Sequence, residues 1–267
     1  MAHRPYRYLQ LMLVLRNSLL LNAHEYTLTD TPQDGLICEF LGMRLRSVFQ
    51  AIHHADGTLV GHEALLRATR LDQAIAPEAA FDYALNANRV VQFDRLVRTI
   101  HLLNHARHYP ETARLFLNVH PYFVNQVGDH GRTFEKILHY HELETSHIVI
   151  EMQPSGEVKP LAAALNNYRA LGYSTALDNV TGADLPQAVQ LKPDRVKLAR
   201  HWIADAVQSP PARSALIAAI VALHSAGIRV AVQGIETAEQ LTLAHAAGAD
   251  EVQGFYVGQA ELTLTGR

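Results

Sequence analysis

Beyond about residue 40, the hydrophobic positions of the chain fall into short runs that alternate with longer segments of helical spacing. The short runs are rich in β-branched and aromatic residues and are bounded by turn residues, which is typical of strands. Eight strands are predicted, over residues 47–54, 58–66, 114–120, 147–152, 174–179, 194–199, 228–233 and 251–257. Helices are predicted over residues 77–86, 89–108, 131–143, 158–172, 209–227 and 238–249. Several of these helical segments close with Gly, as helix C-termini often do.

The connections between these elements predict the topology. Only "ADG", residues 55–57, joins the first two strands, so they should form an antiparallel hairpin. The later connections are long enough for right-handed crossovers between parallel strands. We therefore predict an α/β fold, a TIM-like (β/α)8 barrel with an antiparallel first strand, over residues 41–267.

Residues 1–40 are predicted to be an N-terminal extension that ends in the turn-rich stretch "TDTPQDG". Within it, Leu9 to Leu21 is strongly apolar but is divided by Arg16 and Asn17. It is shorter than the roughly 20 apolar residues of a membrane-spanning helix, so no membrane span is expected. No small-residue cleavage site follows it, which argues against a secretory signal. We interpret the run as an amphipathic helix that packs on the domain or on a partner protein.

The composition favours a compact, soluble protein. The chain has 267 residues, of which 48% are hydrophobic, and a formal net charge of −3, so no broad positive surface is expected to bind a nucleic acid polymer. Its one cysteine, Cys38, permits no intramolecular disulfide and suits a cytoplasmic location, with Cys38 as a small buried side chain. His101 and His105 lie at helical spacing, but no carboxylate or cysteine nearby completes a metal site. We expect them to be solvated surface residues.

Polar residues end seven of the predicted strands. In a barrel of this kind the carboxyl ends of the strands form the concave, functional face. The residues are Glu63, Asn118, Glu151, Asp178 with Asn179, Lys197, Gln233 and Gln253. Three carboxylates and an amide oxygen are hard ligands suited to Mg²⁺, Mn²⁺ or Ca²⁺. Lys197 adds a cation for a phosphate or a water, and Arg67 adds a guanidinium that can bind a phosphoryl group in bidentate fashion. The set indicates phosphodiester binding.

The motifs around these residues resemble those of the EAL domain family. "GHEALLR" (residues 61–67) resembles the family signature, and the resemblance continues in order through "FLNVHP", "IVIEM", "ALDN", "DRVKLA", "VQGIET" and "GADEVQGFYVG", over roughly residues 42–260. It implies a bacterial signalling protein that hydrolyses one phosphodiester bond of cyclic-di-GMP with two divalent metals. The first metal would rest on Glu63, Asn118, Glu151 and Asp178, and the second on Asp178 and on the positions of Asn179 and Gln233. The catalytic positions are Lys197, Gln233 and Glu236, and the ligand-binding positions are Leu65, Arg67, Pro121, Gln253, Gly254 and Phe255.

Several positions depart from the family pattern. The family has an aspartate where this chain has Asn179, and a glutamate where it has Gln233, and both positions belong to the second metal. Each amide removes a negative charge from the shell of a dication, and Gln233 cannot accept a proton. Cofactor binding is thus predicted for one Mg²⁺ or Mn²⁺ ion, with the second site empty. Val180, Thr181 and Pro154 also differ in and beside the loop that couples the family's metal site to its homodimer, so a homodimer is left open.

Three functions remain open from the sequence. The first is a degenerate EAL domain that binds cyclic-di-GMP without cleaving it and reports it to a partner protein; the retained first-metal residues and Arg67 favour it. The second is a regulator that works by protein contact alone, which the N-terminal apolar run favours. The third is an active phosphodiesterase in which Glu236 or a rearranged loop restores the second metal.

Overall fold

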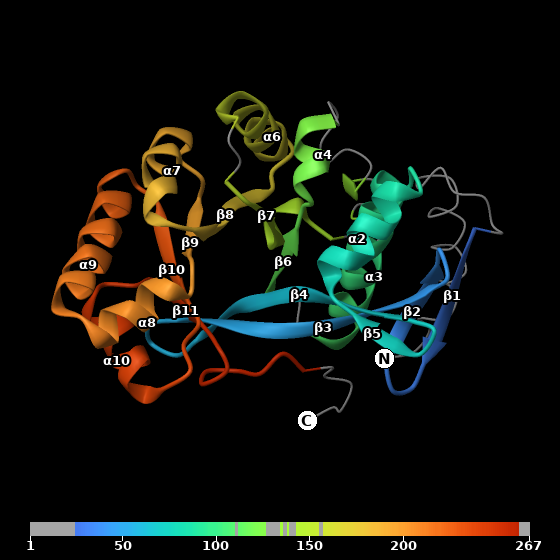
Figure 1. Ribbon diagram of the computed structural model, residues 1–267, viewed down its shortest axis with the longest axis horizontal. Coiled ribbons are helices and arrows are strands. Elements are labelled where there is room, and N and C mark those ends of the chain that lie inside the picture. The colour runs from blue at the N-terminus through green and yellow to red at the C-terminus, as the bar shows by residue number, and fades with distance from the viewer. Residues whose placement is uncertain are drawn as a thin grey trace.

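The computed structural model describes residues 25–109, 112–126, 134–135, 138, 143–154 and 157–261. Its strands are β1 (Tyr26–Thr31), β2 (Gly35–Phe40), β3 (Met43–His54), β4 (Leu59–Arg70), β5 (Gln73–Ile75), β6 (Arg114–Asn118), β7 (Ile148–Met152), β8 (Ser174–Val180), β9 (Arg195–Leu198), β10 (Arg229–Gln233) and β11 (Glu251–Gln253). Its α-helices are α2 (Pro77–Asn86), α3 (Val90–His108), α4 (Pro121–Gln126), α6 (Val158–Ala170), α7 (Leu185–Leu191), α8 (His201–Gln208), α9 (Pro210–Ser225) and α10 (Ala238–Ala246). Figure 1 shows their arrangement.

Eight of these strands close into a barrel. Strands β4, β6, β7, β8, β9, β10 and β11 pair in that order, and each neighbouring pair is parallel. Strand β3 closes the ring between β11 and β4 and is antiparallel to both. The predicted TIM-like barrel with an antiparallel first strand is therefore confirmed.

The β3–β4 ribbon is long and contains an irregularity that sets which residues face the barrel interior. The register shifts between Ile52 and His53, where the pairing passes from Ile52 with Gly61 to His53 with Leu59. Beyond this bulge, Gln50 lies directly opposite Glu63. The bulge therefore brings Gln50 onto the same face of the ribbon as Glu63.

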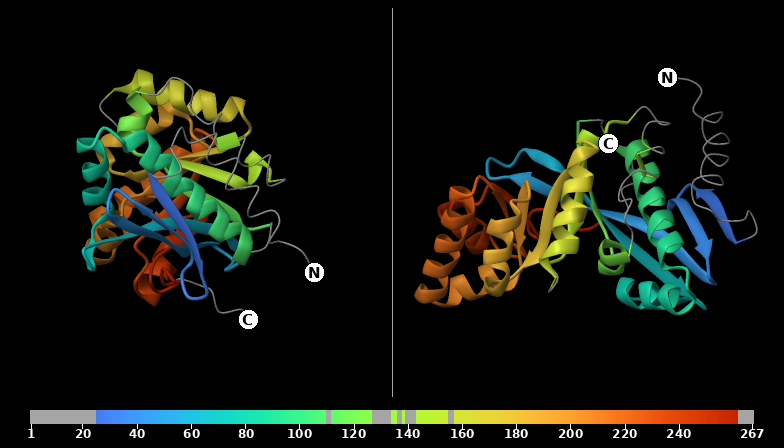
Figure 2. Two further views of the ribbon diagram at one scale, coloured as in Figure 1. Left: turned by 90° about the vertical axis from the view of Figure 1, so that its right-hand side faces the viewer. Right: turned by 90° about the horizontal axis from the view of Figure 1, so that it is seen from above.

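Three strands outside the barrel extend its sheet. Strands β1 and β2 form an antiparallel hairpin, and β2 continues the sheet from the first half of β3, while β5 pairs with the end of β4. Figures 1 and 2 show this hairpin at the end of the molecule opposite α9 and α10. The stretch "TDTPQDG", interpreted from the sequence as the end of an extension, contains the turn of this hairpin. Leu9 to Leu21 lies outside the described residues.

The apolar residues form two clusters. The larger one lies between the strands and the helices that cover them, and includes Cys38, which is completely buried as expected. A small cluster consists of Ile52, Val60, Phe116, Val149 and Ala176, on strands β3, β4, β6, β7 and β8. The predicted helix over residues 131–143 lies mostly outside the described residues. Strand β11 ends at Gln253, earlier than predicted, because the chain turns at Gly254.

The prediction that His101 and His105 lie on the surface is wrong. Both are buried where α3 packs on β2 and β3, at 3% and 6% exposure. His101 Nδ1 lies 2.7 Å from Ser47 Oγ, and His105 Nε2 lies 3.3 Å from His62 Nδ1. Polar partners on the sheet thus allow α3 to bury its histidines, which spacing alone could not indicate.

Among the residues that the structure describes, none of the helices combines the length and the hydropathy needed to cross a bilayer.

Candidate functional site

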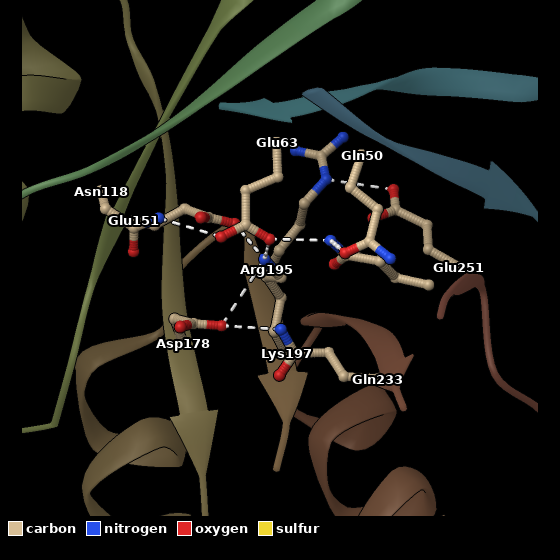
Figure 3. Close-up of polar contacts among 10 residues, drawn as sticks. Gln50, Glu63, Asn118, Glu151, Asp178, Arg195, Lys197, Gln233 and Glu251 are labelled. Atoms are coloured by element: carbon tan, nitrogen blue, oxygen red, sulfur yellow. Dashed lines mark hydrogen bonds and ion pairs between the residues drawn. The ribbon is translucent and has the colours of Figure 1, made fainter. Parts of the chain in front are cut away.

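The carboxyl ends of the parallel strands bring the predicted metal ligands together. Glu63 of β4, Asn118 of β6, Glu151 of β7 and Asp178 of β8 come from consecutive strands of the barrel wall, with Lys197 of β9 among them. Figure 3 shows these side chains converging. These five strand-end residues from the sequence prediction therefore form one cluster in space.

Lys197 lies at the centre of this cluster. Its Nζ is 2.6 Å from Glu151 Oε1, 2.8 Å from Glu63 Oε2 and 3.5 Å from Asp178 Oδ1. The lysine side chain has no exposed surface. The sequence indicated a cation for a phosphate or a water, but the structure places this ammonium below the surface, as the counter-ion of three carboxylates.

The pKa values of the cluster reflect this arrangement. Burial raises the pKa of Glu151, and the negative charge of Glu63 raises it further, so that the nearby Lys197 only partly offsets them. Burial also raises the pKa of Asp178. For Glu63, burial is outweighed by the charge of Lys197 and by three hydrogen-bond donors, and its pKa is lowered. Glu63 is therefore the carboxylate that the protein itself holds most firmly ionised.

Amide side chains hold the Glu63 carboxylate in place. Asn118 Nδ2 donates to Glu63 Oε1 at 2.9 Å, and Gln253 Nε2 donates to Glu63 Oε2 at 2.7 Å. Gln253 Nε2 also donates to Gln50 Oε1 at 3.1 Å, and Gln50 Nε2 donates to the Gly258 carbonyl at 3.0 Å. Gln50 therefore links the closing strand β3 to the carboxylate cluster, a role that the sequence did not indicate.

Gln233 faces the cluster with a hydrogen-bond donor. Its Nε2 donates to Asp178 Oδ1 at 3.0 Å. The adjacent Asn179 is exposed and has a φ of 56°, in the left-handed region that Asn tolerates better than most residues. The two amides that replace carboxylates in the resemblance thus sit differently. Gln233 is bonded to the cluster, whereas Asn179 lies on the solvent side of the strand end.

The loops after β10 and β11 are joined by backbone hydrogen bonds. Ile235 N donates to the Gln253 carbonyl at 3.1 Å, and Tyr256 N donates to the Ile235 carbonyl at 2.9 Å. A Cβ on Gly254 would lie 2.2 Å from Ile235 N and O, so only glycine permits this approach. Beyond the junction, Phe255 is 64% exposed and Glu236 is also exposed.

The remaining predicted ligand-binding residues lie on the rim of the site. Arg67 and Leu65 belong to the stretch of β4 beyond Glu63 and are half-buried, and Pro121 is exposed at the first position of α4. Arg67 Nη1 donates to the Leu66 carbonyl at 3.0 Å. Within the described part of the chain, no hydrogen bond or ion pair joins these residues to the carboxylate cluster, so a ligand that touches both must span the rim and the centre.

A second buried ion pair, absent from the sequence prediction, joins strands β9 and β11, which lie on either side of β10. Arg195 Nε of β9 donates to Glu251 Oε1 of β11 at 3.0 Å, and both side chains are 1% exposed. Arg195 and Lys197 are alternate residues of β9, and Glu251 and Gln253 are alternate residues of β11. The pair therefore lies one layer nearer the amino-terminal ends of the strands than the cluster does. In the sequence, the charged residue Arg195 at the start of a buried strand was the available sign that a buried ion pair would be found here.

The chemistry of the cluster fits a hard divalent cation. Both Glu151 oxygens are buried without a hydrogen bond in the described part of the chain, although Lys197 is in ionic contact with one of them. Three carboxylates facing one ammonium also leave a negative excess. Among the described residues, no three carboxylate, histidine or cysteine side chains are arranged to coordinate a metal ion. In the cluster, the Lys197 ammonium lies between the carboxylates. Oxygen donors suit a first cation, whereas the N–H of Gln233 does not suit a second.

A sequence model of the EAL domain family matches residues 39–260, most of the chain. The protein belongs to the EAL domain family. Cyclic di-GMP phosphodiesterase RocR of Pseudomonas aeruginosa is 25% identical over 213 residues, which cover 74% of this chain and 53% of RocR. An uncharacterized signaling protein of Caulobacter vibrioides is 25% identical over 217 residues, covering 77% of this chain and 26% of that protein. The chain thus spans about half or less of these relatives.

Solved structures share the fold. PaMucR phosphodiesterase in a c-di-GMP complex aligns with a TM-score of 0.68 at 20% identity, covering 94% of this chain and 96% of that one. A standalone EAL protein from Vibrio cholerae in a c-di-GMP-bound form aligns with a TM-score of 0.70 at 20% identity, covering 79% and 90%. BlrP1 of Klebsiella pneumoniae, in a manganese/cy-diGMP complex, aligns with a TM-score of 0.71 at 19% identity, covering 96% and 66%.

Proposed function

We propose that this protein is a cyclic-di-GMP effector that binds the dinucleotide at the carboxyl end of the barrel and cleaves it slowly or not at all. The observation that carries the proposal is the hydrogen bond from Gln233 Nε2 to Asp178 Oδ1. At this position a two-metal phosphodiesterase of the family requires an oxygen that ligates a cation.

An amide N–H and a second cation compete for the same carboxylate. The N–H bonded to Asp178 occupies one lone-pair direction of Oδ1 without adding a negative charge, so it stabilises the carboxylate in the absence of a second metal. Asn179 adds an amide in place of a carboxylate in the same predicted shell. Two-metal hydrolysis depends on both ions to stabilise the attacking and leaving oxygens, so the loss of one disables turnover.

The first cation site is retained in this proposal. Glu63, Asn118, Glu151 and Asp178 would hold one Mg²⁺ or Mn²⁺, which would supply a Lewis acid that binds and polarises a phosphate oxygen. Lys197 keeps the three carboxylates compatible with burial, and Gln253 and Asn118 fix the orientation of Glu63. Arg67 supplies a second, protein-borne positive charge for the phosphate on the rim.

The exposed residues around the cluster suit the rest of the ligand. Phe255 presents an exposed aromatic ring next to the tightly packed Gly254, and Leu65 on β4 and Pro121 at the start of α4 offer apolar surface. Guanine bases stack on aromatic and apolar side chains of this kind. The bound dinucleotide would then change the surface that a partner protein contacts, which is the output expected of an effector.

An active phosphodiesterase is the second candidate. The likeness to RocR, which is named a cyclic di-GMP phosphodiesterase, supports it. It requires a second-metal ligand to replace Gln233. Glu236 is the nearby carboxylate considered from the sequence, but it is exposed, and its backbone N–H donates to Gln240 Oε1 at 2.6 Å at the start of α10. That capping interaction stabilises the present conformation of the loop between β10 and α10. It therefore weighs against a movement of Glu236 into the site, which the second candidate requires.

The experiment is a calorimetric titration of the protein with cyclic-di-GMP in Mg²⁺ buffer and again in Mn²⁺ buffer, followed by recovery of the nucleotide. The proposal predicts a dissociation constant of about 1 μM or lower, near −8 kcal/mol, with intact ligand recovered. Complete conversion to the linear dinucleotide would establish the active enzyme instead. The absence of any binding would overturn both and leave regulation by protein contact.

A further inference from the structure

Two arginines oppose each other at the outer end of the β3–β4 ribbon. Arg46 of β3 pairs directly with Arg67 of β4, so both side chains leave the same face of the sheet. Gln50 and Glu63, paired four residues nearer the barrel, share that face. Like charges directly opposite each other destabilise a sheet. A protein that keeps this pair therefore gains from an anion placed beside it.

One carboxylate from the β1–β2 turn serves the β3 side of this pair. Arg46 Nη1 donates to Asp34 Oδ1 at 3.1 Å, and Arg44 Nη2 donates to Asp34 Oδ2 at 3.4 Å. On the same face, Glu63 lies four residues nearer the barrel than Arg67, and Glu39 of β2 lies opposite Arg44 rather than opposite Arg46. Asp34 is thus the internal anion of the arginine pair, and it reaches Arg46 only.

Arg67 lacks such a partner. Across the described residues, its recorded hydrogen bond is the one to the Leu66 carbonyl, and no ion pair to a carboxylate is found. Burial lowers the pKa of Arg67, and the charge of Arg46 lowers it further. Burial and the neighbouring charge both disfavour the charged form of Arg67, so a bound anion would stabilise this half-buried guanidinium.

We propose that Arg46 is a second phosphate-binding residue beside Arg67, and that Asp34 holds Arg46 in the ligand-free protein and releases it to the ligand. The inference rests on the proposed binding of cyclic-di-GMP and adds a residue to that site. Arg46 has the freedom to exchange partners, because its side chain is 42% exposed whereas Asp34 is 18% exposed. A phosphate held by two guanidinium groups offers more charge-assisted hydrogen bonds than one partly exposed ion pair.

The exchange would couple the ligand to the N-terminal hairpin. Asp34 precedes the residues that match the family, and its backbone N–H donates to Thr31 Oγ1 at 3.0 Å within the β1–β2 turn. When Arg46 turns to a phosphate, Asp34 keeps only the more exposed Arg44, and the turn loses one of its two links to β3. The ligand therefore loosens the turn that connects β1 to the barrel, which gives the effector a route of output.

The test compares five proteins by calorimetric titration with cyclic-di-GMP: wild type, Arg46→Gln, Arg44→Gln, Asp34→Asn and the double variant Asp34→Asn/Arg46→Gln. Arg44 is the matched control, because it also contacts Asp34 but lies opposite Thr69 instead of an arginine. We expect Arg46→Gln to weaken binding about tenfold or more, and Arg44→Gln to change it by less than about threefold. Asp34→Asn should tighten binding, and this gain should vanish when it is combined with Arg46→Gln.

Hydrogen exchange provides a readout that does not depend on affinity. At saturating ligand, exchange at the β1–β2 turn should become faster in the wild type and stay unchanged in Arg46→Gln. Thermal unfolding of each ligand-free variant checks the fold, and Arg46→Lys, which keeps the charge, should retain most of the affinity if the glutamine variant unfolds.

The inference would be overturned if Arg46→Gln bound the dinucleotide with wild-type affinity and Asp34→Asn changed the affinity equally with and without Arg46→Gln. The proposed function would then remain intact. Failure of the wild type itself to bind the dinucleotide would overturn both.

Discussion

Lys197 Nζ lies 2.6 Å from Glu151 Oε1 inside the barrel, and neither side chain has any exposed surface. The lysine shares its charge with Glu63 and Asp178, so one buried cation compensates three carboxylates. Its pKa is governed first by burial, which lowers it, but the surrounding carboxylates outweigh burial and raise the pKa well above the ordinary value. Lys197 is thus a permanent positive charge at the base of the site.

Replacement of Lys197 by Met should therefore be strongly destabilising. Removing one partner of a buried ion pair leaves the other charge uncompensated and costs about 3–5 kcal/mol. Urea unfolding at neutral pH without divalent metal measures the change. Lys159→Met, at an exposed position of α6, is the matched control and should change stability by less than about 0.5 kcal/mol. Equal stability of the two variants would show that Lys197 does not balance the carboxylates.

Acid should destabilise the protein through the histidines under α3. Burial lowers the pKa of His62 to about 4, and the charge of His53 contributes. Burial likewise lowers the pKa values of His101 and His105 to about 3. Below about pH 6.5 the unfolded chain binds protons that the folded chain does not, so stability is complete above that pH and falls as the pH drops toward 4. From about pH 7 to about pH 5.5 the loss is roughly 1 kcal/mol per histidine.

Denaturant unfolding at a series of pH values tests this dependence. His105→Gln, which removes one titrating group, should give a shallower fall in stability with decreasing pH than the wild type. His201→Gln, at an exposed position of α8, serves as the control and should leave the slope unchanged. A stability that is flat between about pH 7 and about pH 5 would contradict the burial of neutral histidines.

Gly254 should tolerate no side chain. A Cβ there would lie 2.2 Å from the backbone N and O of Ile235, atoms that cannot move without breaking the junction between the two loops. Gly254→Ala should therefore cost about 2 kcal/mol or more and weaken ligand binding, since Gln253 precedes it. Gly258→Ala is the control, because its Cβ would lie 3.4 Å from the Ala51 Cβ and 4.0 Å from the Ala51 N, ordinary van der Waals distances. Thermal unfolding of the two variants compares them, and similar unfolding temperatures would exclude the proposed close approach.

The sequence was a good guide to the barrel because the strands are short apolar runs that end in polar residues. Parallel strands of a barrel all present their carboxyl ends on one side, so Glu63, Glu151, Asp178 and Lys197 could be assigned to one site from strand order alone. Their contacts confirm that they lie together.

Other features required knowledge of register and packing. Counting back from the "ADG" turn without a bulge would place Gln50 opposite His62, whereas the bulge at Ile52 and His53 places it opposite Glu63. A single-residue shift of this kind has no reliable signal in one sequence. The β1–β2 hairpin was missed because the turn residues between its strands were interpreted as the end of an extension, and the pairing of β2 with β3 is not visible in the sequence.

We infer that two amides, Asn179 and Gln233, disable turnover in a site that otherwise retains its ligands. The most direct measurement is the rate of cyclic-di-GMP hydrolysis by the double variant Asn179→Asp/Gln233→Glu in Mn²⁺ and Mg²⁺ buffers, compared with the wild type at saturating substrate. Asn166→Asp/Gln190→Glu, which changes the net charge equally at exposed helix positions, is the control. We expect a rate roughly a hundredfold higher or more in the double variant, with the control as slow as the wild type. A wild type that already hydrolyses the dinucleotide as fast as the double variant would contradict it.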